Sequence, residues 1–164
     1  MNFKLEHLPK RTKIPREHGL TMVMDKGLSL QETQYFLENS GEYADLVKFG
    51  FGTSFMNKNF AEKIKLYHEA KIKVYCGGTL FEAFLIRNQL DAYLKFLDKF
   101  KIDTLEVSDG SMVIPHDEKC EIISRLSKRF TVLSEVGSKE EGILISPAKW
   151  IRMMSNELKA GSWK

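Results

Sequence analysis

Three lysines and three carboxylates stand out because each lies at or just beyond the end of a short apolar run. They are Lys26, Lys48, Lys139, Asp25, Glu106 and Glu135. Carboxylate oxygens suit a hard divalent cation, and ammonium groups bind phosphate or sulfonate oxygens. If the apolar runs are parallel strands, the six side chains converge on one rim, which would suit an anionic substrate held through a divalent cation. For any one of them a solvated loop charge remains the alternative, because charged residues are common at strand ends.

Two glycine-rich segments follow apolar runs in the same way. They are Gly50-Phe51-Gly52-Thr53-Ser54 and Gly77-Gly78-Thr79. Backbone N–H and hydroxyl groups in such segments could bind an anion, since a helix is expected soon after each. A tight turn explains the glycines equally well.

Other chemically notable residues have structural interpretations. His68 and His116 lack companions at metal-ligand spacing and are expected on the surface or in packing roles. Cys76 and Cys120 are too few for a metal cluster or a disulfide framework and are expected as reduced thiols. The methionines in apolar runs are expected to fill the core, and these are Met22, Met24, Met153 and Met154.

The elements that must position the charged residues alternate between strand and helix. Strands are expected at 20–24, 44–48, 72–76, 104–107 and 130–135. Helices are expected after Ser29 as N-cap, from 60 to 67, from 80 to 100 with a break near Asn88, after Pro115, and from the Ser146-Pro147 pair to Gly161. This alternation predicts a parallel sheet with right-handed crossovers.

Both a doubly wound sheet and a β/α barrel satisfy the alternation, and the polar residues help to choose. They follow every expected strand, as in barrels, which build their sites from the loops of several strands. A doubly wound sheet would concentrate them at one switch point. Neither GxGxxG nor GxxxxGK[ST] follows the first strand, so nucleotide-binding signals are absent. The pattern favours a barrel.

The composition indicates a folded chain and gives no strong sign that the chain binds a polyanion such as nucleic acid. The 164 residues are 43% hydrophobic and 29% charged, with a formal net charge of +3. Lys and Arg are interspersed with Asp and Glu, so no nucleic-acid partner is expected. No apolar run approaches the roughly 18 residues of a membrane span, and the polar N-terminus lacks a signal-peptide region. We expect a soluble, cytoplasmic protein with no membrane partner.

Five strand-end motifs resemble those of the phosphosulfolactate synthase family, in the same order and over essentially the whole chain. They are Met24-Asp25-Lys26-Gly27, Asp45-Leu46-Val47-Lys48-Phe49-Gly50-Phe51-Gly52-Thr53-Ser54, Val74-Tyr75-Cys76-Gly77-Gly78-Thr79-Leu80-Phe81-Glu82, Leu105-Glu106-Val107-Ser108-Asp109-Gly110 and Leu133-Ser134-Glu135-Val136-Gly137-Ser138-Lys139.

The resemblance implies a (β/α)8 barrel of the TIM type, roughly 250 residues long, and an enzyme of the carbon–sulfur lyase class. The implied reaction is the Mg²⁺-dependent addition of sulfite to phosphoenolpyruvate, giving 2-phospho-3-sulfolactate for coenzyme M or sulfolactate biosynthesis. It implies Asp25, Glu106 and Glu135 as Mg²⁺ ligands and Lys139 as the general acid. The implied substrate-binding residues are Lys26, Lys48, Gly50, Thr53, Ser54, Gly77, Gly78, Thr79, Ser108 and Asp109.

The resemblance also predicts how the chain divides. Residues 1–164 would form a single partial barrel domain, with an N-terminal extension at 1–18 and five β/α units at 19–164 that stop before the sixth strand. Apolar edges at the first and fifth strands would promote association, so we expect a homo-oligomer. The alternative is a non-catalytic relative similar to plant heat-stress-associated proteins, or an inactive fragment. Lysines and acids at all five strand ends favour the enzyme.

Overall fold

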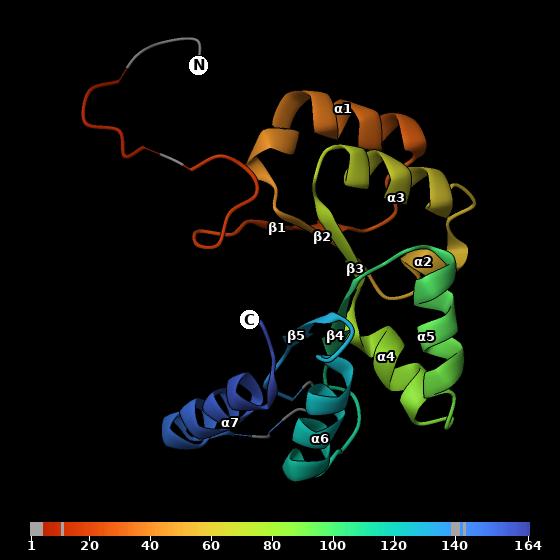
Figure 1. Cartoon of the computed structure of the whole chain (residues 1–164), viewed down its shortest axis with the longest axis vertical. Coiled ribbons are helices and arrows are strands. Elements are labelled where there is room, and N and C mark those ends of the chain that lie inside the picture. The colour runs from red at the N-terminus through yellow and green to blue at the C-terminus, as the bar shows by residue number, and fades with distance from the viewer. Residues whose placement is uncertain (1–4, 11, 139–141, 143) are drawn as a thin grey trace.

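A computed structural model describes residues 5–10, 12–138, 142 and 144–164 (Figure 1). Within them the strands are β1 (Met22–Asp25), β2 (Leu46–Phe49), β3 (Lys73–Cys76), β4 (Thr104–Val107) and β5 (Thr131–Ser134). The helices are α1 (Leu30–Ser40), α2 (Thr53–Met56), α3 (Phe60–Glu69), α4 (Gly78–Leu85), α5 (Leu90–Lys99), α6 (His116–Leu126) and α7 (Pro147–Ala160), with a 3₁₀ turn η1 (Gly41–Tyr43) after α1. The predicted alternation of strand and helix is confirmed.

All the strand pairs that the structure describes are parallel and follow chain order, but they form two sheets. One sheet has the order β1-β2-β3 and the other pairs β4 with β5. β3 and β4 lie next to each other, joined by side-chain bonds rather than a backbone ladder. Lys73 Nζ lies 3.1 Å from Asp103 Oδ2, and the Gly78 N–H donates to Glu106 Oε1 at 2.7 Å. The fold is mixed α/β with partial sheets, without a closed barrel in the described part of the chain.

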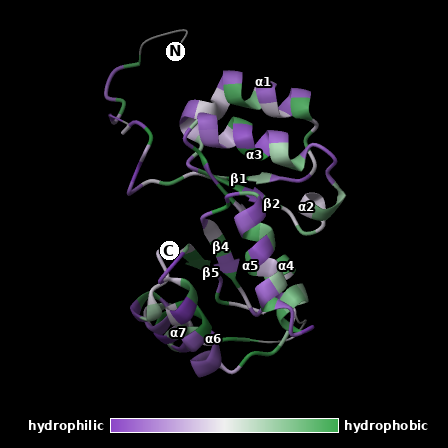
Figure 2. Ribbon diagram, turned by 45° about the vertical axis from the view of Figure 1, so that its right-hand side comes forward, coloured by the Kyte–Doolittle hydropathy of each residue, from purple (hydrophilic) through white to green (hydrophobic). Residues whose placement is uncertain are grey.

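Helix ends follow the local signals in the sequence. The Ser29 side chain accepts from the Glu32 N–H while the Glu32 carboxylate accepts from the Ser29 N–H, which forms a capping box. At α7 the Ser146 side chain caps the first turn, Pro147 begins the helix, and Gly161 ends it at a φ of 116°. Figure 2 shows hydrophobic and hydrophilic bands alternating along α1 and α3, which lie side by side over the first sheet.

One face of the strands packs against the helices and forms the core. Val47, Val74 and Leu105 are fully buried on this face. Because side chains alternate along a strand, the residues directly before and after these three in the sequence point to the opposite face. Met22 and Met24 lie on that opposite face of the edge strand β1 and are 46% and 43% exposed, so their predicted place in the core is wrong.

The last residues of the chain lie along the free edge of β5. The Trp163 N–H donates to Val132 O at 2.7 Å, and the Ser134 N–H donates to Lys164 O at 3.0 Å. The Ser162 hydroxyl also donates to Val132 O. These residues therefore occupy the position next to β5 where a sixth strand was expected. Among the described residues, no helix is both long and apolar enough to cross a bilayer.

Candidate functional site at the carboxyl ends of the strands

Lys48, Glu106 and Glu135 form a polar cluster, called here the Lys48 cluster. Lys48 Nζ lies 2.8 Å from Glu106 Oε1 and 3.7 Å from Glu135 Oε2. Lys48 and Glu106 each lie one residue before the end of their strands, β2 and β4, and Glu135 directly follows β5. The structure thus brings together three of the six charged residues selected from the sequence, and one ammonium group lies between two carboxylates.

Glu106 is the buried member of this cluster. Its side chain is 7% exposed, against 45% for Glu135. Burial raises the pKa of Glu106 above its ordinary value of 4.5, and the nearby charge of Glu135 adds to the rise. Hydrogen bonds from Lys48 and from the Gly78 N–H at the first turn of α4 act in the opposite direction. Glu106 is therefore a carboxyl group that holds its proton more tightly than a solvated one.

Glycines at 77 and 78 permit this close approach of side chains. A Cβ on Gly78 would lie 2.2 Å from Ser108 Oγ and 2.8 Å from Glu106 Oε1. A Cβ on Gly77 would lie 3.0 Å from Lys48 Cε. The Gly77-Gly78-Thr79 turn was predicted to bind an anion, and the anion that its Gly78 N–H contacts is the Glu106 carboxylate.

Tyr75 is a cluster neighbour that sequence reasoning missed. It pairs with Lys48 in the register of β2 and β3, so the two side chains share a face, and it is 3% exposed. Burial raises the pKa of the Tyr75 hydroxyl, and the charge of Glu106 and its hydrogen bond with the hydroxyl raise it further. The available signal in the sequence was that Tyr75 follows the core residue Val74, because adjacent strand residues point to opposite faces of a sheet.

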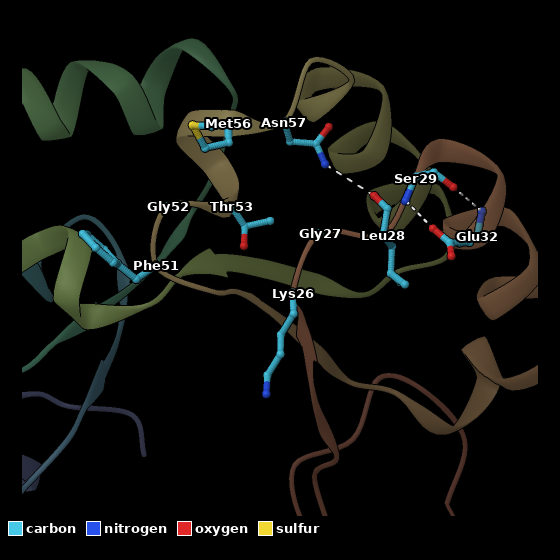
Figure 3. A pocket seen from close by; sticks show the side chains of 10 residues that line it. All are labelled: Lys26, Gly27, Leu28, Ser29, Glu32, Phe51, Gly52, Thr53, Met56 and Asn57. Atoms are coloured by element: carbon cyan, nitrogen blue, oxygen red, sulfur yellow. Dashed lines mark hydrogen bonds between the residues drawn. The ribbon is translucent and has the colours of Figure 1, made fainter.

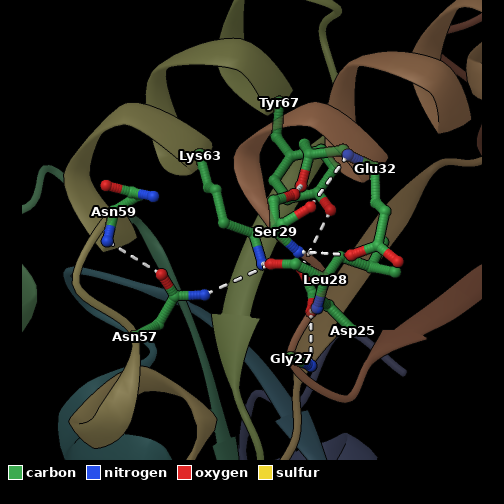
Figure 4. A network of polar contacts seen from close by, with 10 residues as sticks. Asp25, Gly27, Leu28, Ser29, Glu32, Asn57, Asn59, Lys63 and Tyr67 are labelled. Atoms are coloured by element: carbon green, nitrogen blue, oxygen red, sulfur yellow. Dashed lines mark hydrogen bonds and ion pairs between the residues drawn. The ribbon is translucent and has the colours of Figure 1, made fainter.

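Asp25 belongs to a separate network on the helix-covered side of β1 (Figure 4). Its Oδ2 accepts from Tyr67 Oη at 3.0 Å and lies 2.5 Å from Lys63 Nζ. Its Oδ1 accepts from the N–H groups of Gly27 and Leu28, each at 2.9 Å. Burial would raise the pKa of Asp25, but Lys63 and the two N–H donors outweigh it and hold the pKa below 3.8. The structure does not bring this carboxylate to the Lys48 cluster.

Lys26 and Thr53 line a hollow of about 530 Å³ between the loops after β1 and β2 (Figure 3). In this view the Lys26 side chain and the Thr53 hydroxyl extend in the same direction. Gly50 lies at the base of the second loop, where its N–H donates to Asp25 O at 3.0 Å. Ser54 does not face the hollow: it is 8% exposed and contacts Cys76, whose pKa burial raises to about 12.

Ser108 and Asp109 follow β4 in a loop that two buried charged residues hold in place. Ser108 Oγ donates to Glu82 in a short hydrogen bond, and the Ser111 N–H donates to Glu82 Oε2 at 2.8 Å. Asp109 Oδ1 lies 2.9 Å from Lys119 Nζ. Glu82 and Lys119 lie on helices, and nothing in the sequence distinguishes them from the solvent-exposed charges that helices usually carry.

The comparisons with known proteins decide the family. A family model described as "(2R)-phospho-3-sulfolactate synthase (ComA)" matches residues 9–164. The chain belongs to the phosphosulfolactate synthase family. The resemblance of its strand-end motifs is thereby confirmed.

Three curated proteins named phosphosulfolactate synthase match the chain. The protein of Bacillus subtilis (strain 168) is 35% identical over 165 residues, which cover 99% of this chain and 65% of that protein. The protein of Methanothermobacter thermautotrophicus is 35% identical over 159 residues, covering 94% and 62%. The protein of Methanocaldococcus jannaschii is 37% identical over 151 residues, covering 89% and 60%. The chain therefore spans less than two thirds of the length of these phosphosulfolactate synthases.

Lys139, the predicted general acid, lies outside the described residues. Among the described residues, no group of three or more His, Cys, Asp or Glu side chains is arranged to hold a metal ion. Glu106 and Glu135 do share one cation, Lys48, and two carboxylates suffice for Mg²⁺, which is often held by one or two carboxylates with its other positions filled by water or substrate. These two residues fit the ion.

Proposed function

We propose that the Lys48 cluster is part of the active site of a phosphosulfolactate synthase, which adds sulfite to phosphoenolpyruvate with the help of Mg²⁺. The observation that supports this proposal is an ammonium group between two carboxylates at the carboxyl ends of parallel strands from two neighbouring sheets, in a chain of this family. We also propose that the β/α units are part of a (β/α)8 barrel, a fold in which the carboxyl ends of the strands carry the active site.

The reaction makes one carbon–sulfur bond. The sulfur lone pair of sulfite attacks the methylene carbon of phosphoenolpyruvate, and the electron pair of the carbon–carbon double bond moves toward the carboxylate. A proton then bonds to the phosphate-bearing carbon, which gives 2-phospho-3-sulfolactate. Negative charge accumulates between these two steps, so the site must stabilise an anion.

The cluster residues can divide this work. Glu106 and Glu135 would hold Mg²⁺, which when bound supplies Lewis-acid stabilisation of the substrate carboxylate. Asp25 is not included among these ligands because Lys63, Tyr67 and two N–H groups already contact its oxygens. The Lys48 ammonium would pair with an oxygen of the anionic substrate.

Substrate groups would contact the surrounding loops. The Lys26 ammonium and the Thr53 hydroxyl, which line the hollow between the loops after β1 and β2, suit a phosphate or sulfonate group. Ser108 and Asp109 lie on the loop held by Glu82 and Lys119. The family resemblance assigns the final proton to Lys139.

Lys48 provides the test of the proposal. Phosphoenolpyruvate consumption and product formation would be followed by ³¹P NMR with and without sulfite, and phosphoenolpyruvate affinity by calorimetry. Lys48→Met should weaken affinity or turnover by roughly 10-fold to 100-fold, the scale of a hydrogen bond to a charged group. Lys95→Met, on the exposed surface of α5, is the matched control and should behave as wild type. Product formed equally by wild type and Lys48→Met would reject the assignment.

A further inference from the structure

A second basic hollow lies at the opposite end of the strands from the Lys48 cluster. It has a volume of about 430 Å³ and is lined by His68, Lys71, Ile72, Lys73, Lys101 and Asp103. These residues lie at the amino ends of β3 and β4, whereas the Lys48 cluster lies near the carboxyl ends of the strands. Nothing in the proposed reaction uses them.

Two of these lysines have a backbone conformation that lysine rarely adopts. Lys71 has a φ of 61° and Lys101 a φ of 55°, both in the left-handed region. They occupy equivalent positions, two residues after the ends of α3 and α5. Glycine or asparagine is the usual residue there because a Cβ in this region is unfavourable. The same unfavourable choice at both positions places two ammonium groups around one hollow.

The charge balance of the hollow is positive. Among its lining residues only Asp103 is acidic, and its Oδ2 lies 3.1 Å from Lys73 Nζ, which leaves the charges of Lys71 and Lys101 uncompensated within the lining. Burial opposes ionisation of Asp103, but hydrogen bonds from Thr104 and Lys73 and the positive charges of Lys73 and His68 lower its pKa. Glu69, next to His68 in the chain, lies 3.8 Å from Lys65.

We propose that this hollow binds a small phosphate-bearing anion, at a site separate from the Lys48 cluster. Lysines from two loops that line one hollow suit a tetrahedral dianion, because each ammonium group can donate to a different oxygen. Residues on four-residue strands are about 10 Å apart from end to end, so one such anion cannot occupy both sites. A second anion site would give phosphate a way to bind the protein without competing for the proposed active site.

The glycine substitutions at 71 and 101 separate a binding role from a structural one. Lys71→Gly/Lys101→Gly removes both charges and also removes the unfavourable Cβ contacts. We therefore expect weaker phosphate binding together with a melting temperature that is unchanged or higher. Asn88→Gly is the matched control: Asn88 also has a left-handed φ, of 55°, but it does not line the hollow.

Inorganic phosphate in low-salt buffer is the probe, with binding followed through the amide resonances of residues 68–73 and 101–103 by ¹⁵N NMR. The double variant should bind about fivefold or more weakly, as expected for the loss of two exposed ion pairs. In Asn88→Gly and Lys48→Met, phosphate should shift the amide resonances of residues 68–73 and 101–103 as it does in wild type. Asp103→Asn should bind phosphate more tightly. Unchanged affinity in the double variant would overturn the proposal, as would a much stronger response to an oligonucleotide than to phosphate. Lys48→Met tests the proposed active site independently.

Discussion

The chemistry of Glu106 depends on which neighbour is present. Lys48 and the Gly78 N–H favour its charged form, whereas burial and Glu135 favour the protonated form, and the net effect is a raised pKa. A cation bound by both glutamates would favour the charged form of Glu106 and would lower its pKa. Proton and cation binding should therefore compete at Glu106.

The raised pKa predicts how stability varies with pH. Between the ordinary pKa of 4.5 and the raised value, the folded state binds more protons at Glu106 than the unfolded state does. The Glu106 contribution to the free energy of unfolding must then fall as pH rises through this window. Glu106→Gln cannot titrate, so wild type should lose stability relative to this variant as pH rises from 4.5 through the raised folded-state pKa of Glu106. Urea unfolding at several pH values measures the difference, and a relative gain by wild type would contradict the prediction.

Gly78 is the position where a single methyl group should disturb the cluster. A Cβ there would overlap Ser108 Oγ and Glu106 Oε1. We expect Gly78→Ala to destabilise the fold by about 1–3 kcal/mol, the usual cost of overpacking. Gly41→Ala is the matched control, since Gly41 has a helical φ of −56° and the nearest atom to its Cβ is a flexible Leu37 methyl at 3.3 Å. Equal midpoints of urea denaturation for the two variants would show that Ser108 and Glu106 simply move aside.

At the scale of elements, two buried lysines connect helices to the loops at the strand ends. Lys63 on α3 reaches Asp25 and donates to Leu28 O at 2.6 Å. Lys119 on α6 contacts Asp109, Glu135 O and the buried Glu157 of α7, the last at 2.8 Å. Both lysine side chains are fully buried, so each charge depends on these partners. The loops that carry the candidate site are thereby fixed to the helical layer.

Asp25→Asn tests this connection. It removes one charge of a buried pair whose side chains are 1% and 0% exposed, which leaves the Lys63 charge uncompensated. We expect a loss of about 3–5 kcal/mol in the free energy of unfolding at neutral pH. Because the pKa of Asp25 is lowered, its contribution is present above pH 3.8 and is lost as pH falls through the folded-state pKa, so the two proteins should converge in acid.

The exposed pair of Lys73 and Asp103 is the control for Asp25→Asn. Its side chains are 39% and 64% exposed, and Asp103→Asn should therefore cost about 1 kcal/mol or less. Chemical denaturation of both variants would measure the contrast. Equal losses would mean that burial does not distinguish the two pairs.

The sequence predicted elements better than side-chain directions. Ser29, Ser146 and Gly161 carry local capping signals, and all three are confirmed as helix ends. The direction of the Asp25 side chain could not be inferred, because its partner Lys63 is distant in sequence and looks like an ordinary helical charge. The division into two sheets, without a backbone ladder between β3 and β4 in the described residues, also could not be predicted. It depends on tertiary contacts such as that of Glu106 with Gly78.

At the scale of the whole molecule, apolar surfaces on β1 and on α7 are left exposed among the described residues. One is formed by Met22 and Met24 on the edge strand β1, which are 46% and 43% exposed. The other, on α7, comprises Trp150, Ile151, Met154 and Leu158, with exposures from 42% to 65%. Clusters of exposed large apolar side chains favour association, particularly beside a strand edge with free backbone groups.

We expect the chain to self-associate through the α7 surface, because burying several large apolar side chains stabilises a contact by about 25 cal/mol for each Å² removed from water. Ile151→Glu/Met154→Lys places opposite charges on this surface without changing the net charge, and it should shift sedimentation toward monomer and reduce binding of a hydrophobic dye. Tyr35→Glu, on an α1 residue that is 55% exposed, tests whether any lost apolar group has the same effect. A wild-type chain that sediments as a monomer at all concentrations and binds no dye would refute the expectation. Association that persists in the α7 variant would point instead to the edge strand β1, which Met24→Lys would then test.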